Sequence, residues 1–151
     1  MDRKERYRSD EGFTLIELMM VVLIVGILVG IALPTFLGGR TRSQDRATHA
    51  NLRNGLATAK TWHAVSDTYA GFDETQGEAI EPTLVWVAFA DPSIGEVAVG
   101  LVSASDVQLV AESASGAFFC VHDDVAAGTT YGEGAAFADV DTEAECADPS
   151  W

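Results

Sequence analysis

One carboxylate lies inside the only long apolar run of this chain. Between Phe13 and Leu37 the polar side chains are Thr14, Glu17 and Thr35. About 20 apolar residues suffice to cross a bilayer as a helix, so the run is long enough to span. An acidic group at the centre of such a helix costs about 2.5 to 3.5 kcal/mol and therefore usually has a partner or a function. Because Glu17 is near the end of the run, we expect either a carboxylate that reaches the interface or one that pairs with a cation.

The chain itself can supply that cation. Residues 1–12 form a charged segment that the positive-inside tendency places in the cytoplasm; its cations are Arg3, Lys4, Arg6 and Arg8. A secretory signal would place its cleavage site after the apolar core, but no A-x-A pattern follows Leu33 before the chain turns polar. A cut after the small residue Gly12 would keep the span and give Phe13 an α-amino group with a pKa of about 8. An ammonium and Glu17 would then share one apolar layer.

These residues carry a family resemblance. The segment Gly12-Phe13-Thr14-Leu15-Ile16-Glu17-Leu18-Met19, followed by Gly26-Ile27-Leu28 and Ala32-Leu33-Pro34, resembles the prepilin signature of type IV pilins and pseudopilins, and most of all that of a type IVa major pilin. The resemblance implies cleavage after Gly12 and N-methylation of Phe13 by a prepilin peptidase and methyltransferase. It also implies that Glu17 pairs with the α-amine of a neighbouring subunit. The acidic pair Asp10-Glu11 departs from the family, whose leaders are more often basic.

The resemblance further implies a structural subunit that polymerises with itself into a type IV pilus. A membrane platform and a motor would drive assembly, and lipid would surround the helix beforehand. The subunit would be a single-pass protein of the cytoplasmic membrane, with its leader in the cytoplasm and its head outside, and later part of an extracellular fibre. Two alternatives stay open: a pseudopilin of a type II secretion system, and an anchored acidic binding module that does not polymerise.

Helical features follow the acidic residue. Gly26 and Gly30 form a G-x-x-x-G pair that allows close helix packing. Pro34 cannot donate to the carbonyl of Gly30, so we expect a kink or loosening between them. Apolar residues then recur at three- and four-residue steps, at Leu52, Leu56, Ala59, Trp62 and Val65. The sequence predicts one helix from Phe13 to about Val65, with an apolar part over 13–36 and an amphipathic part over 37–66.

Residues 67–151 are predicted to form a small β head, which makes the chain an α+β protein with a removable leader over 1–12. We expect a loop over 73–82. Short β-rich runs follow, separated by turn residues, at 83–90, 95–102, 107–111 and 116–122. Their short spacing, without a second helix of crossover length, predicts an antiparallel sheet.

Cys120 and Cys146 are the only cysteines. Export of the head would carry them into an oxidising space, where a disulfide is the natural state. Two free thiols are the alternative, while a zinc site would need further ligands that spacing alone does not indicate. The bridged segment 121–145 is expected to be a C-terminal loop closed by this disulfide, and it also resembles the variable region of the family.

The head is strongly acidic. The net charge is −14, and no Lys or Arg follows Lys60, whereas 17 Asp and Glu residues do. Such a surface repels phosphate backbones, so we expect no nucleic-acid partner for the head. Asp139, Asp141 and Glu143 alternate, so an extended backbone would place them on one side as calcium ligands. A solvated acidic face is the simpler interpretation, and no metal or other cofactor is predicted.

Little in the chain indicates an enzyme. His122-Asp123-Asp124 could supply a base and an orienting carboxylate, but neighbours in a strand alternate faces and no nucleophile motif accompanies them. His49 and His63 are about 21 Å apart on the expected helix, too far for one metal. We therefore predict a structural protein.

Overall fold

The computed structural model of the chain describes residues 12–148 and 151. The predicted leader, including Asp10-Glu11, lies outside the described residues except for Gly12. The chain divides into two compact units, with the division between Gly39 and Arg40, and each is described by itself below.

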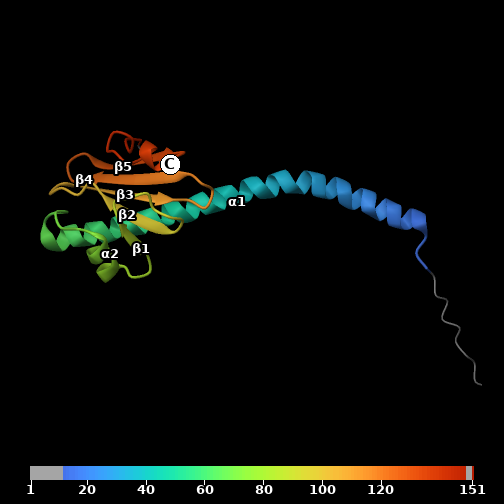
Figure 1. The fold of residues 1–151 in the computed structure, drawn as a ribbon, viewed down its shortest axis with the longest axis horizontal. Helices are drawn as coiled ribbons and strands as arrows, with labels where there is room; N and C mark the ends of the chain where they lie inside the picture. The colour runs from blue at the N-terminus through green and yellow to red at the C-terminus, as the bar shows by residue number, and fades with distance from the viewer. Residues whose placement is uncertain (1–11, 149–150) are drawn as a thin grey trace, which may run out of the picture. The chain divides into compact units, whose positions relative to one another are not determined.

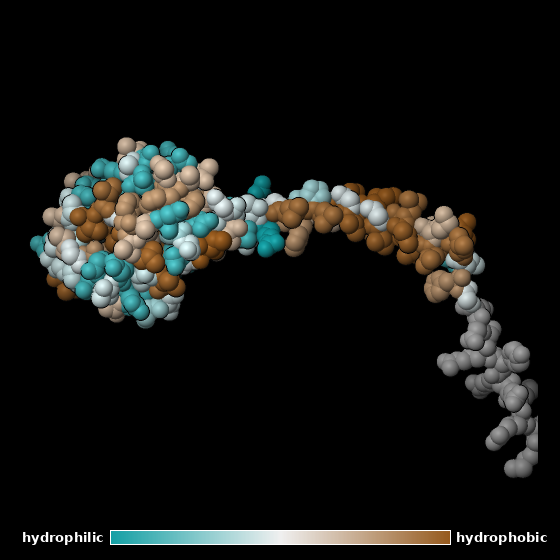
Figure 2. All heavy atoms as spheres, in the orientation of Figure 1, coloured by the Kyte–Doolittle hydropathy of each residue, from teal (hydrophilic) through white to brown (hydrophobic). Residues whose placement is uncertain are grey.

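The first unit is apolar helix. Helix α1, Leu15–Ser66, begins here and is the one described helix long and apolar enough to cross a membrane (Figure 1). Every described side chain up to Gly39 is exposed, and the surface of this segment is largely hydrophobic (Figure 2). Pro34 lies inside the helix, and the Thr35 hydroxyl donates to the carbonyl of Ala32 at 2.8 Å. The kink between Gly30 and Pro34 stays a prediction.

The second unit begins with the amphipathic part of α1, which packs on a sheet (Figure 1). Leu52, Leu56 and Ala59 are buried on the face that the sequence predicts. Gly55 permits the close approach, because a Cβ there would lie 3.0 Å from Leu109. The helix ends at Ser66, and Asp67 follows in the left-handed region with φ of 57°.

Five strands form the sheet in the order β1-β2-β3-β4-β5. Their bounds are Val85–Ala88 for β1, Glu96–Gly100 for β2, Asp106–Glu112 for β3, Phe118–Asp124 for β4 and Gly128–Gly134 for β5. The four predicted runs correspond to β1 to β4, whereas β5 lies in the segment expected to be a loop. The mainly antiparallel α+β fold is confirmed.

One pair of strands differs from the prediction. β1 and β2 are parallel, with Val85 opposite Glu96 and Ala88 opposite Val99, while the other three pairs are antiparallel. Parallel strands usually need a crossover of a dozen residues or more. Here the chain returns over residues 89–95, and the ring of Phe89 lies directly on Gly100, where any side chain would collide with it.

The predicted loop over 73–82 is wrong in its centre, which forms helix α2, Glu74–Ile80. The side chain of Asp73 caps this helix by accepting from the backbone N–H of Gln76 at 2.9 Å. Gly77 is buried against Trp86, whose indole N–H donates to the carbonyl of Glu81 at 3.0 Å. This contact gives a seven-residue helix tertiary support that its composition does not reveal.

Strand alternation divides the buried residues into two clusters. Val97, Val107, Leu109, Phe119 and Val121 face α1 and form the larger cluster with it. On the other face, the smaller cluster is covered by the C-terminal segment, which includes the 3-10 helix η1, Phe137–Asp139; its buried members are Ala98, Val110, Phe118, Cys120, Val140 and Cys146. The central strands are therefore buried on both faces.

Candidate assembly segment and the sites that hold the head

The first turn of α1 is closed by a reciprocal pair of hydrogen bonds. Glu17 Oε2 accepts from the backbone N–H of Thr14 at 2.8 Å and from its hydroxyl at 2.7 Å, while Thr14 Oγ1 accepts from the backbone N–H of Glu17 at 3.3 Å. This is a capping box, in which a Thr before the helix and a Glu three residues later satisfy each other's backbone donors. Glu17 thus fixes the start of the helix as well as carrying a charge.

The same bonds place the carboxylate next to the predicted new amino terminus. Oε2 binds the amide of Thr14, the residue directly after Phe13, and Oε1 has no hydrogen bond among the described residues. A hollow of about 390 Å³ is lined by Gly12, Phe13, Thr14 and Glu17. No cation of residues 12–148 or 151 pairs with Glu17. One carboxylate oxygen therefore remains available for a group from outside the chain.

The other predicted residues of this segment have open surroundings. A Cβ on Gly26 or Gly30 would meet nothing within 4 Å, so the structure neither uses nor blocks this surface. Phe13 itself is 88% exposed. Their roles in packing and methylation stay predictions.

The predicted disulfide is formed. Cys120 of β4 and Cys146 are bonded, with Cα atoms 5.9 Å apart, and both are fully buried. The C-terminal segment is held there by further bonds: Gln108 Nε2 donates to the carbonyl of Val140 at 2.7 Å, and Tyr131 pairs with Asp148 as an isolated antiparallel bridge. The bridged segment is therefore not a simple loop, because it contains β5 and then folds back over the sheet.

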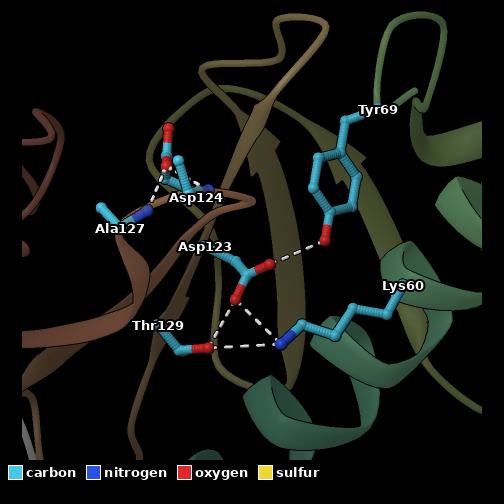
Figure 3. Close-up of polar contacts among 7 residues, drawn as sticks. Lys60, Tyr69, Asp123, Asp124, Ala127 and Thr129 are labelled. Carbon is cyan, nitrogen blue, oxygen red and sulfur yellow. Dashed lines mark hydrogen bonds and ion pairs between the residues drawn. The ribbon is translucent and has the colours of Figure 1, made fainter. Parts of the chain in front are cut away.

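A polar network joins α1 to the other end of the sheet (Figure 3). Asp123 of β4 is buried on the face toward α1 and forms an ion pair with Lys60 at 2.8 Å. The Tyr69 hydroxyl donates to Oδ2 of Asp123 at 2.7 Å, and the hydroxyl of Thr129 in β5 donates to Oδ1, the oxygen that pairs with Lys60. Burial raises the pKa of Asp123, but the hydrogen bonds from Lys60, Thr129 and Tyr69 outweigh it and hold the pKa below its ordinary value. Burial and the bond to Asp123 raise the pKa of Tyr69.

Sequence reasoning missed this network. It treated Asp123 only as part of His122-Asp123-Asp124, and the structure does not bring these three together as a site. His122 and Asp123 alternate along β4, and Asp124 accepts from the backbone N–H groups of Ala126 and Ala127 in the following turn. The usable signal was the period of the strand, which puts Asp123 on the same face as Phe119 and Val121.

An aromatic stack joins α1 to the end of the chain. His49 lies flat on Trp151 with ring centroids 4.3 Å apart and meets the edge of Phe119 at 4.4 Å. The Arg53 guanidinium lies 5.3 Å from the centre of the Trp151 ring. Burial and then the charge of Arg53 lower the pKa of His49. His63 belongs to a different contact, since its ring packs on Tyr69.

The predicted calcium candidates are Asp139, Asp141 and Glu143, which would share one side of an extended backbone. The structure shows no extended backbone there, so this reason for expecting a calcium site is wrong. Asp139 ends η1 and accepts from the backbone N–H groups of Ala135 and Ala136, each at 3.0 Å. Asp141 and Glu143 follow in a bend and a turn. No cluster of acidic, His and Cys residues suited to a metal occurs in the described part of the chain.

Comparison with known proteins places the N-terminal segment. Residues 7–33 match the prokaryotic N-terminal methylation motif. The type IV major pilin protein PilA of Myxococcus xanthus is 40% identical over 72 residues, which are 48% of this chain and 33% of that protein. The type IV narrow pilus major component PilA5 of Thermus thermophilus is 41% identical over 60 residues, 40% of this chain and 48% of that one. The type IV major alpha-pilin of Moraxella bovis is 45% identical over 47 residues, 31% and 30% of the two chains.

The chain thus carries the prokaryotic N-terminal methylation motif and is similar, over the aligned part, to type IV major pilins. The chain spans 30% to 48% of the length of the relatives named here. No solved structure matches the chain.

Proposed function

We propose that this protein is the structural subunit of a type IV pilus, which assembles by packing its N-terminal helices after removal of the leader and methylation of Phe13. The observation that carries the proposal is the Glu17 carboxylate at the start of an exposed apolar helix, with one oxygen bonded to Thr14 and the other open. The match of residues 7–33 to the methylation motif and the similarity to major pilins support it.

The mechanism follows from the chemistry of the first turn. Cleavage after Gly12 creates a cationic amine on Phe13, and an incoming subunit brings that amine to the open oxygen of a neighbour's Glu17. In an environment without water, leaving either charge alone is far more costly than pairing them, so the pair selects the axial register of the new subunit. Burial of apolar helix surface against other helices then replaces its contacts with lipid.

The partners that the structure does not contain are inferred from the same steps. A membrane peptidase and methyltransferase must process residues 12 and 13. A platform and a motor must supply the work of extracting the span, since moving so much apolar surface out of lipid is otherwise very costly. Before assembly the subunit is held in the membrane by residues 13–36 with its head outside, and afterwards it belongs to an extracellular fibre.

The alternatives make different products. A type II secretion pseudopilin would act as a piston in place of a long surface fibre, and a binding module would remain a single-pass monomer after processing. The similar proteins named above are pilus components, which favours the surface fibre.

The deciding experiment separates the charge of Glu17 from its cap. Glu17→Gln keeps a side chain that can close the capping box but removes the charge, Glu17→Ala removes both, and Thr14→Val removes only the cap. We expect both Glu17 variants to be processed and retained in the membrane while sheared surface fibres fall about tenfold or more, because an unpaired buried amine remains. Thr14→Val should lose much less.

The measurements are electron microscopy of sheared fibres and mass analysis of the mature amino terminus. Normal fibre yield from Glu17→Gln would rule out the charge pair, and the absence of fibres from the unchanged chain would rule out the pilus.

A further inference from the structure

All cations of the second unit lie on α1. Residues 40–151 contain five, at Arg40, Arg42, Arg46, Arg53 and Lys60, against eighteen Asp and Glu residues. Four of the five are separated by four, seven and seven residues and so follow one line along the helix. We call Arg42, Arg46, Arg53 and Lys60 the basic stripe. Because the rest of the unit is acidic, we ask which carboxylates form ion pairs with the basic stripe.

Two residues of the basic stripe, Arg53 and Lys60, contact other residues of the same head. Lys60 is paired with Asp123, and Arg53 lies over the ring of Trp151. The other half, Arg42 and Arg46, is exposed, and no carboxylate of the described residues lies within ion-pair distance of either. The half that faces the sheet is therefore used inside the subunit, while the half before it presents two unpaired guanidinium groups.

The densest acidic surface of the chain also lacks a cation. Residues 139–148 carry five carboxylates in ten positions and no Lys or Arg. We call Asp139, Asp141, Glu143, Glu145 and Asp148 the acidic C-terminal surface. The side chains of Asp139 and Glu145 accept bonds from backbone N–H groups in their own turns, whereas the side chains of Asp141 and Glu143 have no hydrogen bond in the described part of the chain. The disulfide between Cys146 and Cys120 joins this segment to β4.

We propose that Arg42 and Arg46 of one subunit dock on the acidic C-terminal surface of a second copy. This proposal rests on the proposed function, because the second copy is the neighbour in the fibre. Arginine forms paired bonds with carboxylates, and a series of such contacts offsets the repulsion between heads that each carry a large negative charge.

The geometry of the contact also suits a fibre. The basic and acidic patches are different surfaces of the same chain, so the contact is heterologous, and repeating it generates an open helical array unless its rotation closes a ring. Under the proposed function the contact is of the open kind, because successive subunits of a fibre rise along its axis. The contact would therefore reinforce the direction of growth that Glu17 begins.

The first test converts the guanidinium groups into amines. In fibres of an Arg42→Lys, Arg46→Lys variant, a carbodiimide should join the introduced amines to carboxylates of residues 139–148 in another subunit, as mapped by mass spectrometry of digests. In unchanged fibres Lys60 is the one lysine beyond the leader, so those products should be missing. Links only to carboxylates elsewhere, or none, would overturn the proposal.

The second test is a charge exchange. Arg42→Glu with Arg46→Glu should lower fibre yield about fivefold or more, and adding Asp141→Arg with Glu143→Arg should restore most of it. The matched control adds Glu78→Arg with Asp91→Arg, two exposed acids far along the chain that make the same change in net charge. Equal rescue by both pairs would show that net charge alone matters and would refute specific docking.

The two levels of failure are distinguishable. If the unchanged chain forms no fibre, the pilus function fails. If the unchanged chain forms fibres and these substitutions do not change the fibre yield, the pilus function is retained and the docking proposal fails.

Discussion

Glu17 illustrates how a single residue combines two roles. Its charge in an apolar run is visible in the sequence, and so was the spacing Thr14-x-x-Glu17 that announces a capping box. The family resemblance accounts for the charge of Glu17 by giving it a partner, but it does not point to the capping box. The structure adds that the cap leaves one oxygen free and orients it at the helix start.

Asp123 is the opposite case, a residue whose importance sequence reasoning did not find. Its partners are 63, 54 and 6 residues away in the chain, and nothing local links Lys60, Tyr69 and Thr129 to it. Strand alternation could have placed it on the helix face, yet identifying the partners needs the register of β4 against β5 and against α1.

We expect removal of the Asp123 carboxylate to weaken the head. Asp123→Ala leaves the buried Tyr69 hydroxyl without its acceptor and should lower the free energy of unfolding by about 2 to 3 kcal/mol, whereas Tyr69→Phe should cost about 1 kcal/mol. Chemical unfolding of the full chain in detergent micelles, followed by near-ultraviolet circular dichroism, measures both. The double variant should cost less than the sum; strict additivity would mean that the two groups are not coupled.

The same network predicts a loss of stability in acid. The folded pKa of Asp123 lies below its ordinary value of 3.8, so the stabilisation is complete above that value and is lost as the pH falls through the lowered pKa. The unfolding free energy of Asp123→Asn should therefore depend less on pH below about 4 than that of the unchanged chain. Parallel curves in this range would contradict the assignment.

Elements with a strong period were predictable, and elements supported by distant contacts were not. The three- and four-residue steps after Leu37 gave α1, and the β-branched runs gave β1 to β4. Strand β5 was missed because its sequence, Gly-Thr-Thr-Tyr-Gly-Glu-Gly, has few apolar residues. It is placed by pairing with β4, a contact between chain segments that no local pattern contains.

Helix α2 and the parallel pairing of β1 with β2 were not predicted from the sequence, and the reason is the same for both. Both depend on glycines that admit a neighbouring ring: Gly77 admits Trp86 and Gly100 admits Phe89. In the sequence, Gly77 lies in an acidic connector and is typical of a loop. Its role in helix α2 becomes clear only from its contact with the ring of Trp86.

Filling the space at Gly77 should destabilise the head. A Cβ there would lie 2.5 to 2.8 Å from ring atoms of Trp86, so Gly77→Ala forces the ring to move and should cost about 1 to 3 kcal/mol. Gly39→Ala is the matched control, since a Cβ there meets nothing within 4 Å and should be neutral or slightly stabilising. Thermal unfolding in detergent compares them; a neutral Gly77→Ala would mean that α2 is not held by this contact.

At the scale of the whole molecule, the C-terminal segment is fastened by one covalent bond and a few polar ones. The sequence predicted the bond from the export of the head, but not that the segment covers the second face of the sheet with Phe137 and Val140. The segment covers this face because β3 and β4 are buried on both faces. Their apolar runs in the sequence are too short to distinguish a strand that is buried on one face from a strand that is buried on both.

Loss of the disulfide should therefore affect the head as a whole. Replacing Cys120 and Cys146 together by Ala removes a cross-link between residues 26 apart, for which the chain-entropy model gives about 3.5 kcal/mol. The variant should unfold at lower denaturant concentration, and reduction of the unchanged chain should have the same effect. An unchanged midpoint would show that the polar contacts of the segment suffice.

Beyond the leader, every Lys and Arg of the chain lies on α1, and this has a practical consequence for proteolysis. A protease that cuts only after Lys or Arg has no site in residues 61–151. Its sites beyond the leader lie between Arg40 and Lys60 on α1, at Lys and Arg side chains that are exposed in a lone subunit and that neighbours in the proposed fibre would cover. Brief digestion of free subunits would release the disulfide-bonded remainder as one large fragment, whereas packed subunits would stay whole. The chain thus contains its own reporter of assembly and needs no label.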